Sequence, residues 1–333
     1  MDPRDKPGDD KNGWGNEKMT NAFVFPGQGS QAVGMGKSLA GNFVAARAVF
    51  DEVDAALGQK LSHLTWEGPE AELTLTENAQ PALMAVSMAV IRVLEAEHGI
   101  TVANTARFVA GHSLGEYSAL AAAGTFSLGD AARLLKTRGL AMQSATPVGI
   151  GAMAALLGLD FATASAVAAE AAQGDVCQAA NDNSDGQVVI SGHKAAIARA
   201  MDIAKAKGAK RAILLTVSAP FHCALMQPAA DVMAAALAAV SMNVPVVPVV
   251  ANVGAAPLSD PVAIRASLVR QVTDTVRWRE CVAYMASNGI TRFHEVGAGK
   301  VLTGLAKKNA PEATAFAAGS ADDIVAIAAH MKE

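Results

Sequence analysis

The sequence is poor in charged and aromatic residues and has no excess of basic ones. Of its 333 residues, 17% are charged and 5% are aromatic, whereas 51% are hydrophobic. This apolar content excludes an intrinsically disordered or low-complexity chain. The formal net charge of −4 gives no support to nucleic-acid binding, so we expect no nucleic-acid partner. The length predicts one large or two small domains with ample chain for a core.

Cysteines are also few, and no segment is long and apolar enough to predict a membrane span. Cys177, Cys223 and Cys281 are widely spaced without a CxxC pair, which predicts reduced thiols and no metal site. The N-terminus is charged and lacks the apolar region of a signal peptide. The best candidate for a span, residues 82–94, is shorter than the ~20 residues required and contains Arg92. We therefore expect a cytoplasmic protein with no membrane partner.

Apolar patterning predicts an α/β fold. Residues 1–18 are rich in charge, proline and glycine, so we expect a disordered extension or a tag there. Short apolar runs at 22–25 and 107–110 predict buried strands. A helical period at 78–97 and an Ala/Leu-rich segment at 116–123 predict helices. Such alternation is typical of a mostly parallel sheet covered by helices.

The middle of the chain has a different order of elements. Its apolar patterns predict the order β-α-β-β-α-β, with strands at 151–159, 176–180, 187–191 and 212–217 and helices at 161–172 and 195–206. This order is that of a ferredoxin-like unit. We therefore expect a small ferredoxin-like subdomain at 148–215, inserted into a large hydrolase-like α/β catalytic domain formed by 19–147 and 216–333.

The strongest local signal is GHSLG at residues 111–115, between a predicted strand and a predicted helix. Flanking glycines allow a tight strand-to-helix turn that exposes the Ser113 hydroxyl beside backbone amides at a helix N-terminus. Such amides can stabilise an oxyanion. Ser113 is therefore a candidate nucleophile, with an ordinary helix-capping serine as the alternative.

A serine nucleophile needs a base, and one of the seven histidines has a suitable place in the chain. His222 lies in a Ser-Ala-Pro-Phe-His loop after the last predicted strand of the insert, where the chain returns toward the GHSLG turn. A structural histidine remains the alternative. Five other histidines sit at predicted helix ends, in a predicted strand or near the C-terminus: His63, His98, His193, His294 and His330.

A second glycine-rich segment, FPGQGSQ at 25–31, follows the first predicted strand. It partly matches a dinucleotide fingerprint, but the acidic residues at the right distance, Asp51 and Glu52, lie in a helical pattern rather than at a strand end. We favour backbone amides that face an anion or oxyanion. GAGK at 297–300 lacks the spacing of a phosphate-binding loop.

Taken together, these segments resemble the malonyl-CoA:acyl-carrier-protein transacylases, the acyltransferases of type II fatty-acid synthesis. The resemblance runs in family order through almost everything after residue 20. It rests on FPGQGSQ at 25–31, GHSLGEYSAL at 111–120, RGLAMQ at 138–143, GAMAALLG at 151–158, GQVVISG at 186–192, PFHCALM at 220–226, LVRQ at 268–271 and EVGAGKVLTGL at 295–305.

The resemblance implies roles for the reacting groups. Ser113 would be the nucleophile and His222 the base. The backbone amides of Gln28 and Leu114 would form the oxyanion hole. The backbone carbonyl of Gln271 would orient the histidine in place of an acidic third member.

It also implies how the acyl group is chosen. Arg138 matches the arginine that binds the free carboxylate of the malonyl group, and Met142 lies one helical turn further on the same face. Phe221 resembles the malonyl-selecting version of its loop. One departure is Asp182, where relatives often carry an aromatic residue, and we expect it to alter the wall of the substrate channel.

The implied activity is ping-pong transfer of malonyl from malonyl-CoA to the phosphopantetheine thiol of acyl carrier protein, by a monomer without a cofactor. An acidic carrier would need a basic surface, with candidates Arg277, Arg279, Lys300, Lys307 and Lys308. Three alternatives stay open. They are a GxSxG esterase or hydrolase, a non-catalytic module that binds acyl-CoA or carrier protein, and an acyltransferase that serves another pathway.

Overall fold

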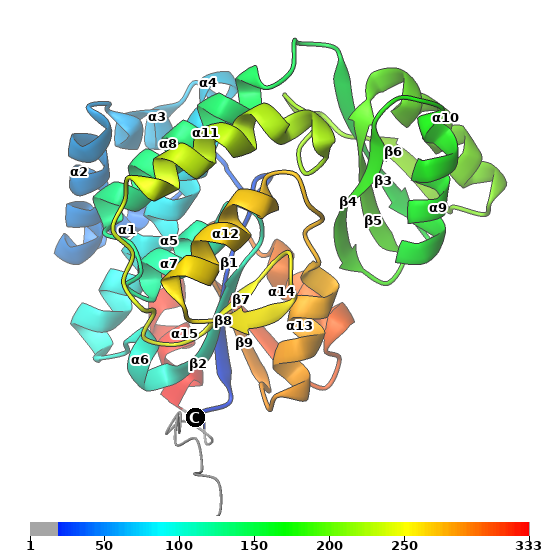
Figure 1. The fold of residues 1–333 in the computed structure, drawn as a ribbon. Coiled ribbons are helices and arrows are strands. Elements are labelled where there is room, and N and C mark those ends of the chain that lie inside the picture. The colour runs from blue at the N-terminus through cyan, green and yellow to red at the C-terminus, as the bar shows by residue number, and fades with distance from the viewer. Residues whose placement is uncertain (1–18, 333) are drawn as a thin grey trace, which may run out of the picture.

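Two β-sheets organise residues 19–332, the part of the chain that this computed structural model describes. The larger sheet has six strands and the smaller has four, and helices pack around both (Figure 1). The predicted α/β class with a largely parallel sheet is therefore correct. The expected extension at 1–18 lies outside the described residues.

The larger sheet has the strand order β10-β9-β1-β2-β7-β8, and every neighbouring pair is parallel except β7 and β8. Phe25 at the end of β1 pairs with Gly111 at the end of β2, so the two glycine-rich loops leave the sheet side by side. The strands are β1 (Asn21–Phe25), β2 (Ala106–Gly111), β7 (Val249–Ala251), β8 (Ala256–Leu258), β9 (Arg292–Val296) and β10 (Thr314–Ala318).

Helices cover both faces of this sheet, which explains why its strands are apolar on both sides. Alternate β1 residues enter different cores: Phe23 and Phe25 pack in one, Ala22 and Val24 in the other. The surrounding helices are α1 (Lys37–Asn42), α2 (Val44–Leu57), α3 (Leu61–Glu67), α4 (Glu70–Thr74), α5 (Thr76–His98), α6 (Val102–Thr105), α7 (Gly115–Ala122), α8 (Leu128–Ser144), α11 (Gln227–Ala238), α12 (Pro261–Gln271), α13 (Trp278–Ser287), α14 (Val301–Asn309) and α15 (Asp323–Lys332), with a short 3₁₀ turn at Ala224–Met226.

Helix α5 contains the candidate membrane segment. The prediction that this segment is too short was wrong, because the helix spans 23 residues and is long and apolar enough to cross a membrane by length and composition alone. However, 83% of its most apolar window is buried inside the fold, against α2 and α8. Its apolarity is thus that of a core helix.

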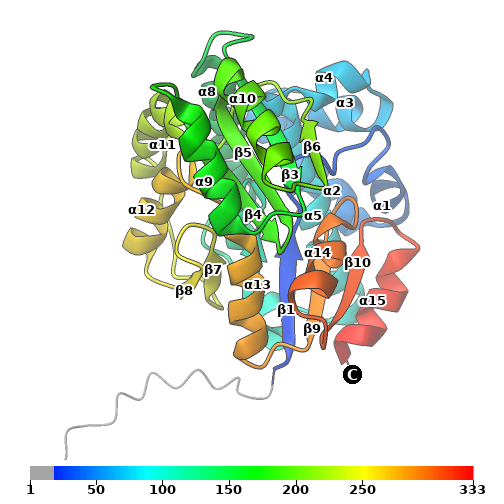
Figure 2. The same cartoon turned by 90° about the vertical axis from the view of Figure 1, so that its right-hand side faces the viewer.

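The second sheet lies beside the first and has the antiparallel order β4-β5-β3-β6. Two helices cover its outer face (Figure 2), and their apolar residues share a core with β3, β4 and β5. The elements are β3 (Gly151–Leu157), α9 (Phe161–Ala172), β4 (Cys177–Ser184), β5 (Gln187–His193), α10 (Lys194–Ala206) and β6 (Arg211–Leu214).

Among the predicted strand limits in this region, the ends of β4 and β6 are the furthest from the structure. β4 continues through residues 181–184, beyond the predicted limit at residue 180. The polar segment remains extended because its backbone is paired on both sides. On one side it pairs with β5. On the other it pairs with the chain around Val276: the Asp182 N–H donates to the Val276 carbonyl, and the Val276 N–H donates to the Ala180 carbonyl. β6 ends at Leu214, three residues before the predicted limit.

Candidate active site

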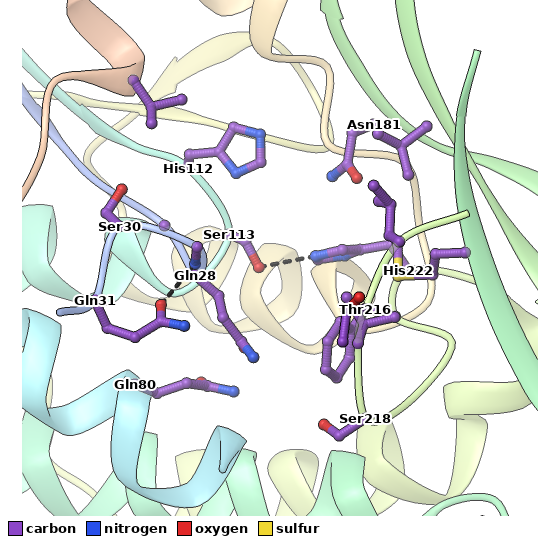
Figure 3. Close-up of a pocket in the computed structure, with 18 of the residues that line it drawn as sticks. Gln28, Ser30, Gln31, Gln80, His112, Ser113, Asn181, Thr216, Ser218 and His222 are labelled. Carbon is purple, nitrogen blue, oxygen red and sulfur yellow. Dashed lines mark hydrogen bonds between the residues drawn. The ribbon is translucent and has the colours of Figure 1, made fainter. Parts of the chain in front are cut away.

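A cavity of about 590 Å³ lies between the two sheets and contains most of the predicted site residues (Figure 3). The larger sheet and its helices contribute Gln28, Gln80, His112, Ser113, Arg138, Met142, Leu302 and Leu305 to its lining. The inner face of the smaller sheet contributes Met153, Asn181, Asn183 and Val189, and the chain returning from it contributes Leu215, Thr216, Phe221 and His222.

Ser113 occupies a sharp turn between β2 and α7. Its φ of +54° lies in the left-handed region that is unfavourable for a side-chain-bearing residue. The turn brings α7 against the end of β1 so closely that a Cβ on Gly115 would lie 2.2 Å from the Phe25 carbonyl oxygen. Only glycine fits there, so the GHSLG pattern fixes the turn that presents the Ser113 hydroxyl to the cavity.

The loop after β1 packs directly on this turn. A Cβ on Gly27 would lie 2.8 Å from the His112 carbonyl oxygen. The backbone amides of Gln28 and Leu114 donate to no group among residues 19–332. In contrast, the Ser113 amide already donates to Asn252 Oδ1 at 2.8 Å. Gln28 and Leu114 thus leave two amides beside the serine for a ligand oxygen.

Ser113 and His222 are brought together in spite of the 109 residues between them. Ser113 Oγ lies 2.8 Å from His222 Nε2 (Figure 3). His222 Nδ1 lies 2.8 Å from the backbone oxygen of Gln271. A carbonyl can only accept, so Nδ1 carries the proton and Nε2 is free to accept one from the serine. His222 also has a positive φ, +58°. Both side chains of the dyad are therefore held by unusual backbone conformations.

Burial keeps the imidazole of His222 neutral. Desolvation, followed by the positive charge of nearby Arg138, lowers the pKa of His222 to about 3. In its neutral form the ring is a proton acceptor at ordinary pH.

Arg138 is a buried cation that points at the serine. Its side chain is 1% exposed, and Nη2 donates to Ser113 Oγ at 3.1 Å and to Gln271 Oε1 at 3.0 Å. Nη1 donates to Gln80 Oε1 at 2.8 Å. None of the ion pairs formed within residues 19–332 involves Arg138. The groups that accept hydrogen bonds from its guanidinium are neutral, so Arg138 has no carboxylate in direct contact.

Two further predicted residues line the same cavity. Met142 lies on α8 one turn beyond Arg138, and its sulfur is 3.8 Å from Gln80 Nε2. Phe221, immediately before His222, is buried at the cavity wall. Asp182, in contrast, is absent from the cavity lining and forms an ion pair with Arg279 at 2.8 Å. The expectation that Asp182 shapes the channel wall is therefore wrong: this carboxylate is used to join β4 to α13.

Comparisons with known proteins agree with this geometry. The acyl transferase domain family matches residues 22–322. The chain belongs to the acyl transferase family. It is 50% identical over 296 residues to the malonyl CoA-acyl carrier protein transacylase of Escherichia coli strain K12, covering 89% of this chain and 94% of that protein. The resemblance predicted from the motifs is confirmed.

Solved structures show the same fold. The crystal structure of the acyl-carrier-protein-S-malonyltransferase from Bartonella henselae aligns with a TM-score of 0.92 and 56% identity, covering 95% of this chain and all (100%) of that one. A second solved structure is that of a type II PKS acyl-carrier protein in complex with its malonyl-transacylase. It aligns with a TM-score of 0.90 and 44% identity, covering 93% of this chain and 99% of the matched chain.

This acyl transferase site also contains residues that the sequence analysis missed. Gln80 on α5 accepts a hydrogen bond from Arg138, and Asn252, which follows β7, accepts one from the Ser113 amide. Glu116 on α7 is buried and accepts from the Asn252 backbone amide. A signal for Asn252 was present, because a polar residue directly after an apolar strand often lies at the functional edge of a parallel sheet. Gln80 and Glu116 lie on helices whose patterns show only burial.

The basic residues suggested for carrier docking are in part already paired. Arg277 forms an ion pair with Glu280, and Arg279 with Asp182. Lys308 contacts Gln187 at 3.4 Å.

The described residues contain no cluster suited to a metal ion: among residues 19–332, no group of three or more His, Cys, Asp or Glu side chains could hold one.

Proposed function

We propose that this protein transfers the malonyl group of malonyl-CoA to the phosphopantetheine thiol of acyl carrier protein through a malonyl ester on Ser113. One observation carries the proposal: a serine-histidine pair and a buried arginine that forms no ion pair meet in a single cavity. The dyad supplies acyl transfer, and the arginine supplies a partner for an acyl group that has its own carboxylate.

In the first half-reaction, Ser113 Oγ attacks the thioester carbonyl while His222 Nε2 takes its proton. The carbonyl oxygen becomes an oxyanion, which the amides of Gln28 and Leu114 stabilise by donating to it. As the tetrahedral intermediate collapses, the C–S bond breaks and His222 returns the proton to the departing thiolate of coenzyme A. Gln271 holds the imidazole in the required tautomer through its backbone carbonyl.

The second half-reaction reverses these steps with another thiol. His222 accepts the proton of the phosphopantetheine thiol, whose sulfur attacks the ester carbonyl. The oxyanion forms in the same place, the bond to Ser113 Oγ breaks, and the serine recovers its proton from His222. Because both thiols use one site in turn, the kinetics are ping-pong.

Arg138 would select the malonyl group. Its guanidinium can donate two charge-assisted hydrogen bonds to the free carboxylate. Acetyl-CoA would leave the buried cation without an anion, so the site discriminates against it. Met142 and Phe221 would form the apolar wall around the short acyl chain.

Relatives support the carrier protein as acceptor, since one solved complex pairs a malonyl-transacylase with a type II PKS acyl-carrier protein. Fatty-acid and polyketide carriers present the same phosphopantetheine thiol, so the chemistry serves either. The residues present supply nucleophile, base and oxyanion donors, and we include no cofactor in the proposal. We further propose a cytoplasmic, monomeric protein without nucleic-acid or membrane partners, consistent with its buried α5 and its free thiols at Cys177, Cys223 and Cys281.

The domain organisation belongs to the same proposal. The order β4-β5-β3-β6 with two helices on one face supports a ferredoxin-like subdomain at residues 148–215. The strand-serine-helix turn at the end of β2 supports a hydrolase-like catalytic domain formed by 19–147 and 216–333. The cavity between the sheets then lies between the two units.

The decisive experiment is intact-protein mass spectrometry after mixing with malonyl-CoA and then with holo acyl carrier protein. We expect a malonyl adduct that disappears as the carrier gains it, and no adduct on Ser113→Ala. An adduct that only hydrolyses would indicate a hydrolase or another acceptor. Binding of coenzyme A without any adduct would indicate a non-catalytic module.

A further inference from the structure

The two residues that orient the dyad are themselves held by a third group. Gln271 fixes His222 through its backbone carbonyl, and its side-chain Nε2 donates to the Ser113 carbonyl at 3.0 Å. Asn252 accepts from the Ser113 amide and donates through Nδ2 to the Gly111 carbonyl at 2.7 Å. Because these residues come from the end of α12 and the end of β7, the dyad geometry depends on how those segments are fixed relative to α7.

Both residues converge on one carboxylate oxygen. Glu116 Oε2 accepts from Gln271 Nε2 at 2.8 Å and from the Asn252 backbone amide at 2.9 Å. Glu116 lies in the first turn of α7, three residues after Ser113, and is 1% exposed. A single atom therefore connects the helix that carries the nucleophile to the two segments that orient the serine and the histidine.

The second carboxylate oxygen of Glu116 is not needed to connect Gln271 with Asn252. Glu116 Oε1 is buried and has no hydrogen-bond partner among the described residues. The amide oxygen of a glutamine at position 116 would accept from the same two donors. A glutamate therefore differs from it in carrying a negative charge when ionised and in being able to bind a proton. Gln271 carries that charge effect toward the reaction centre, because its Oε1 accepts from Arg138 Nη2 while its Nε2 donates to Glu116.

We propose that Glu116 is a positioning residue for acyl transfer, which acts through Gln271 and Asn252 to hold His222 Nε2 against Ser113 Oγ. The proposal rests on the malonyl-transfer function above. The ionised carboxylate makes the stronger, charge-assisted bonds to both orienting residues. Transfer should therefore be faster when Glu116 is ionised than when it is protonated.

This ionisation falls in an accessible range. Burial raises the pKa of Glu116 to about 7, against the lowering effects of its bonds from Asn252 and Gln271 and of the charge of Arg138. The other titratable groups coupled to it are Tyr117 beside it on α7 and Cys281 on α13. Burial raises the pKa of both of these groups, so they stay neutral near pH 7.

The test is the single-turnover rate of Ser113 malonylation between pH 5.5 and 8.5. Wild type is measured first, since failure to form the adduct refutes malonyl transfer itself. We expect the wild-type rate to rise through an ionisation near pH 7. Glu116→Gln keeps an oxygen that accepts both hydrogen bonds but cannot ionise, so its rate should not rise near pH 7. Its rate should stay within roughly 10-fold of the wild-type rate at high pH. Glu116→Ala should be slower by roughly 100-fold, the effect of a misplacement of about 1 Å.

Glu295→Gln is the matched control, because Glu295 is also a fully buried carboxylate but caps α14 through Leu302 and Thr303. It should keep the wild-type pH step even if it loses stability. The proposal is overturned if Glu116→Gln retains the step, or if folded Glu116→Ala loads within 3-fold of wild type. Should Glu116→Ala fail to fold, the pH profile of Glu116→Gln decides alone.

Discussion

His222 should stay neutral in the free protein at any pH where the fold survives. The ring is buried, and the Arg138 guanidinium donates to the same Ser113 oxygen that contacts His222 Nε2. Desolvation and this neighbouring cation lower the pKa of His222 from 6.5 to about 3. Lowering the pH from 8 to 5 should therefore leave the His222 imidazole neutral.

The lowered pKa of His222 corresponds to a large free energy. A shift from 6.5 to about 3 corresponds to ~5 kcal/mol against the imidazolium in the folded protein, at 1.36 kcal/mol for each pKa unit. The unfolded chain binds a proton at His222 below about pH 6.5 and the folded chain does not. The contribution of His222 to the free energy of unfolding therefore falls as the pH drops from about 6.5 toward 3.

The assay is NMR titration of protein labelled in its histidine rings. His222→Gln identifies the His222 signal among the seven histidines. We expect that signal to show no protonation down to pH 4. Arg138→Ala should raise the pKa of His222, because the second-largest of the causes that lower it is removed. A midpoint near 6.5 in the free protein, or an unchanged midpoint in Arg138→Ala, would refute the reasoning.

Three further outcomes follow from particular contacts. Arg138→Ala should reduce the malonyl-over-acetyl preference by roughly 30-fold or more in competition assays, since breaking a buried charge pair costs about 2 to 5 kcal/mol; an unchanged preference would exclude Arg138 as the selector. Gly115→Ala should lower the free energy of unfolding by roughly 3 kcal/mol, because the new Cβ meets the Phe25 carbonyl; denaturant unfolding checks this. Arg279→Met should destabilise the fold less as the pH is lowered from 7, because burial raises the pKa of Asp182, loss of the guanidinium raises it further, and protonation removes the unpaired charge; a loss that does not change with pH would contradict it.

The sequence predicts the parts of this molecule that depend on local patterns. The apolar runs of β1 and β2 and the long helix α5 are visible because β1 is buried throughout and β2 and α5 are buried over most of their length. GHSLG is visible because the close approach at Gly115 excludes every other residue. In the second sheet, the order of strands and helices along the chain follows from apolar patterns, but the end of β4 does not: its polar residues are extended because β5 and a distant segment both pair with them.

Glu116 and its contacts with the orienting residues are hidden from the sequence for the same physical reason. Glu116, Asn252 and Gln271 meet only after three separate segments pack together. The family resemblance names Gln271 and the end of an apolar strand marks Asn252, but no local pattern marks Glu116. Asp182 shows the opposite error. An unusual polar residue near a predicted channel was assigned to the channel, although its carboxylate turns to Arg279 and joins two parts of the fold.

The charges of the site connect substrate choice to the rate of transfer. Burial and Arg138 make His222 a poor proton acceptor in the free protein. A malonyl carboxylate paired with Arg138 would remove one of these two causes, so the pKa of His222 should rise when the acyl group is in place. Acetyl-CoA brings no such anion, and the histidine would remain hard to protonate. In this proposal the carboxylate that identifies the substrate also allows His222 to accept the serine proton, so discrimination should appear in the rate of acyl transfer as well as in binding.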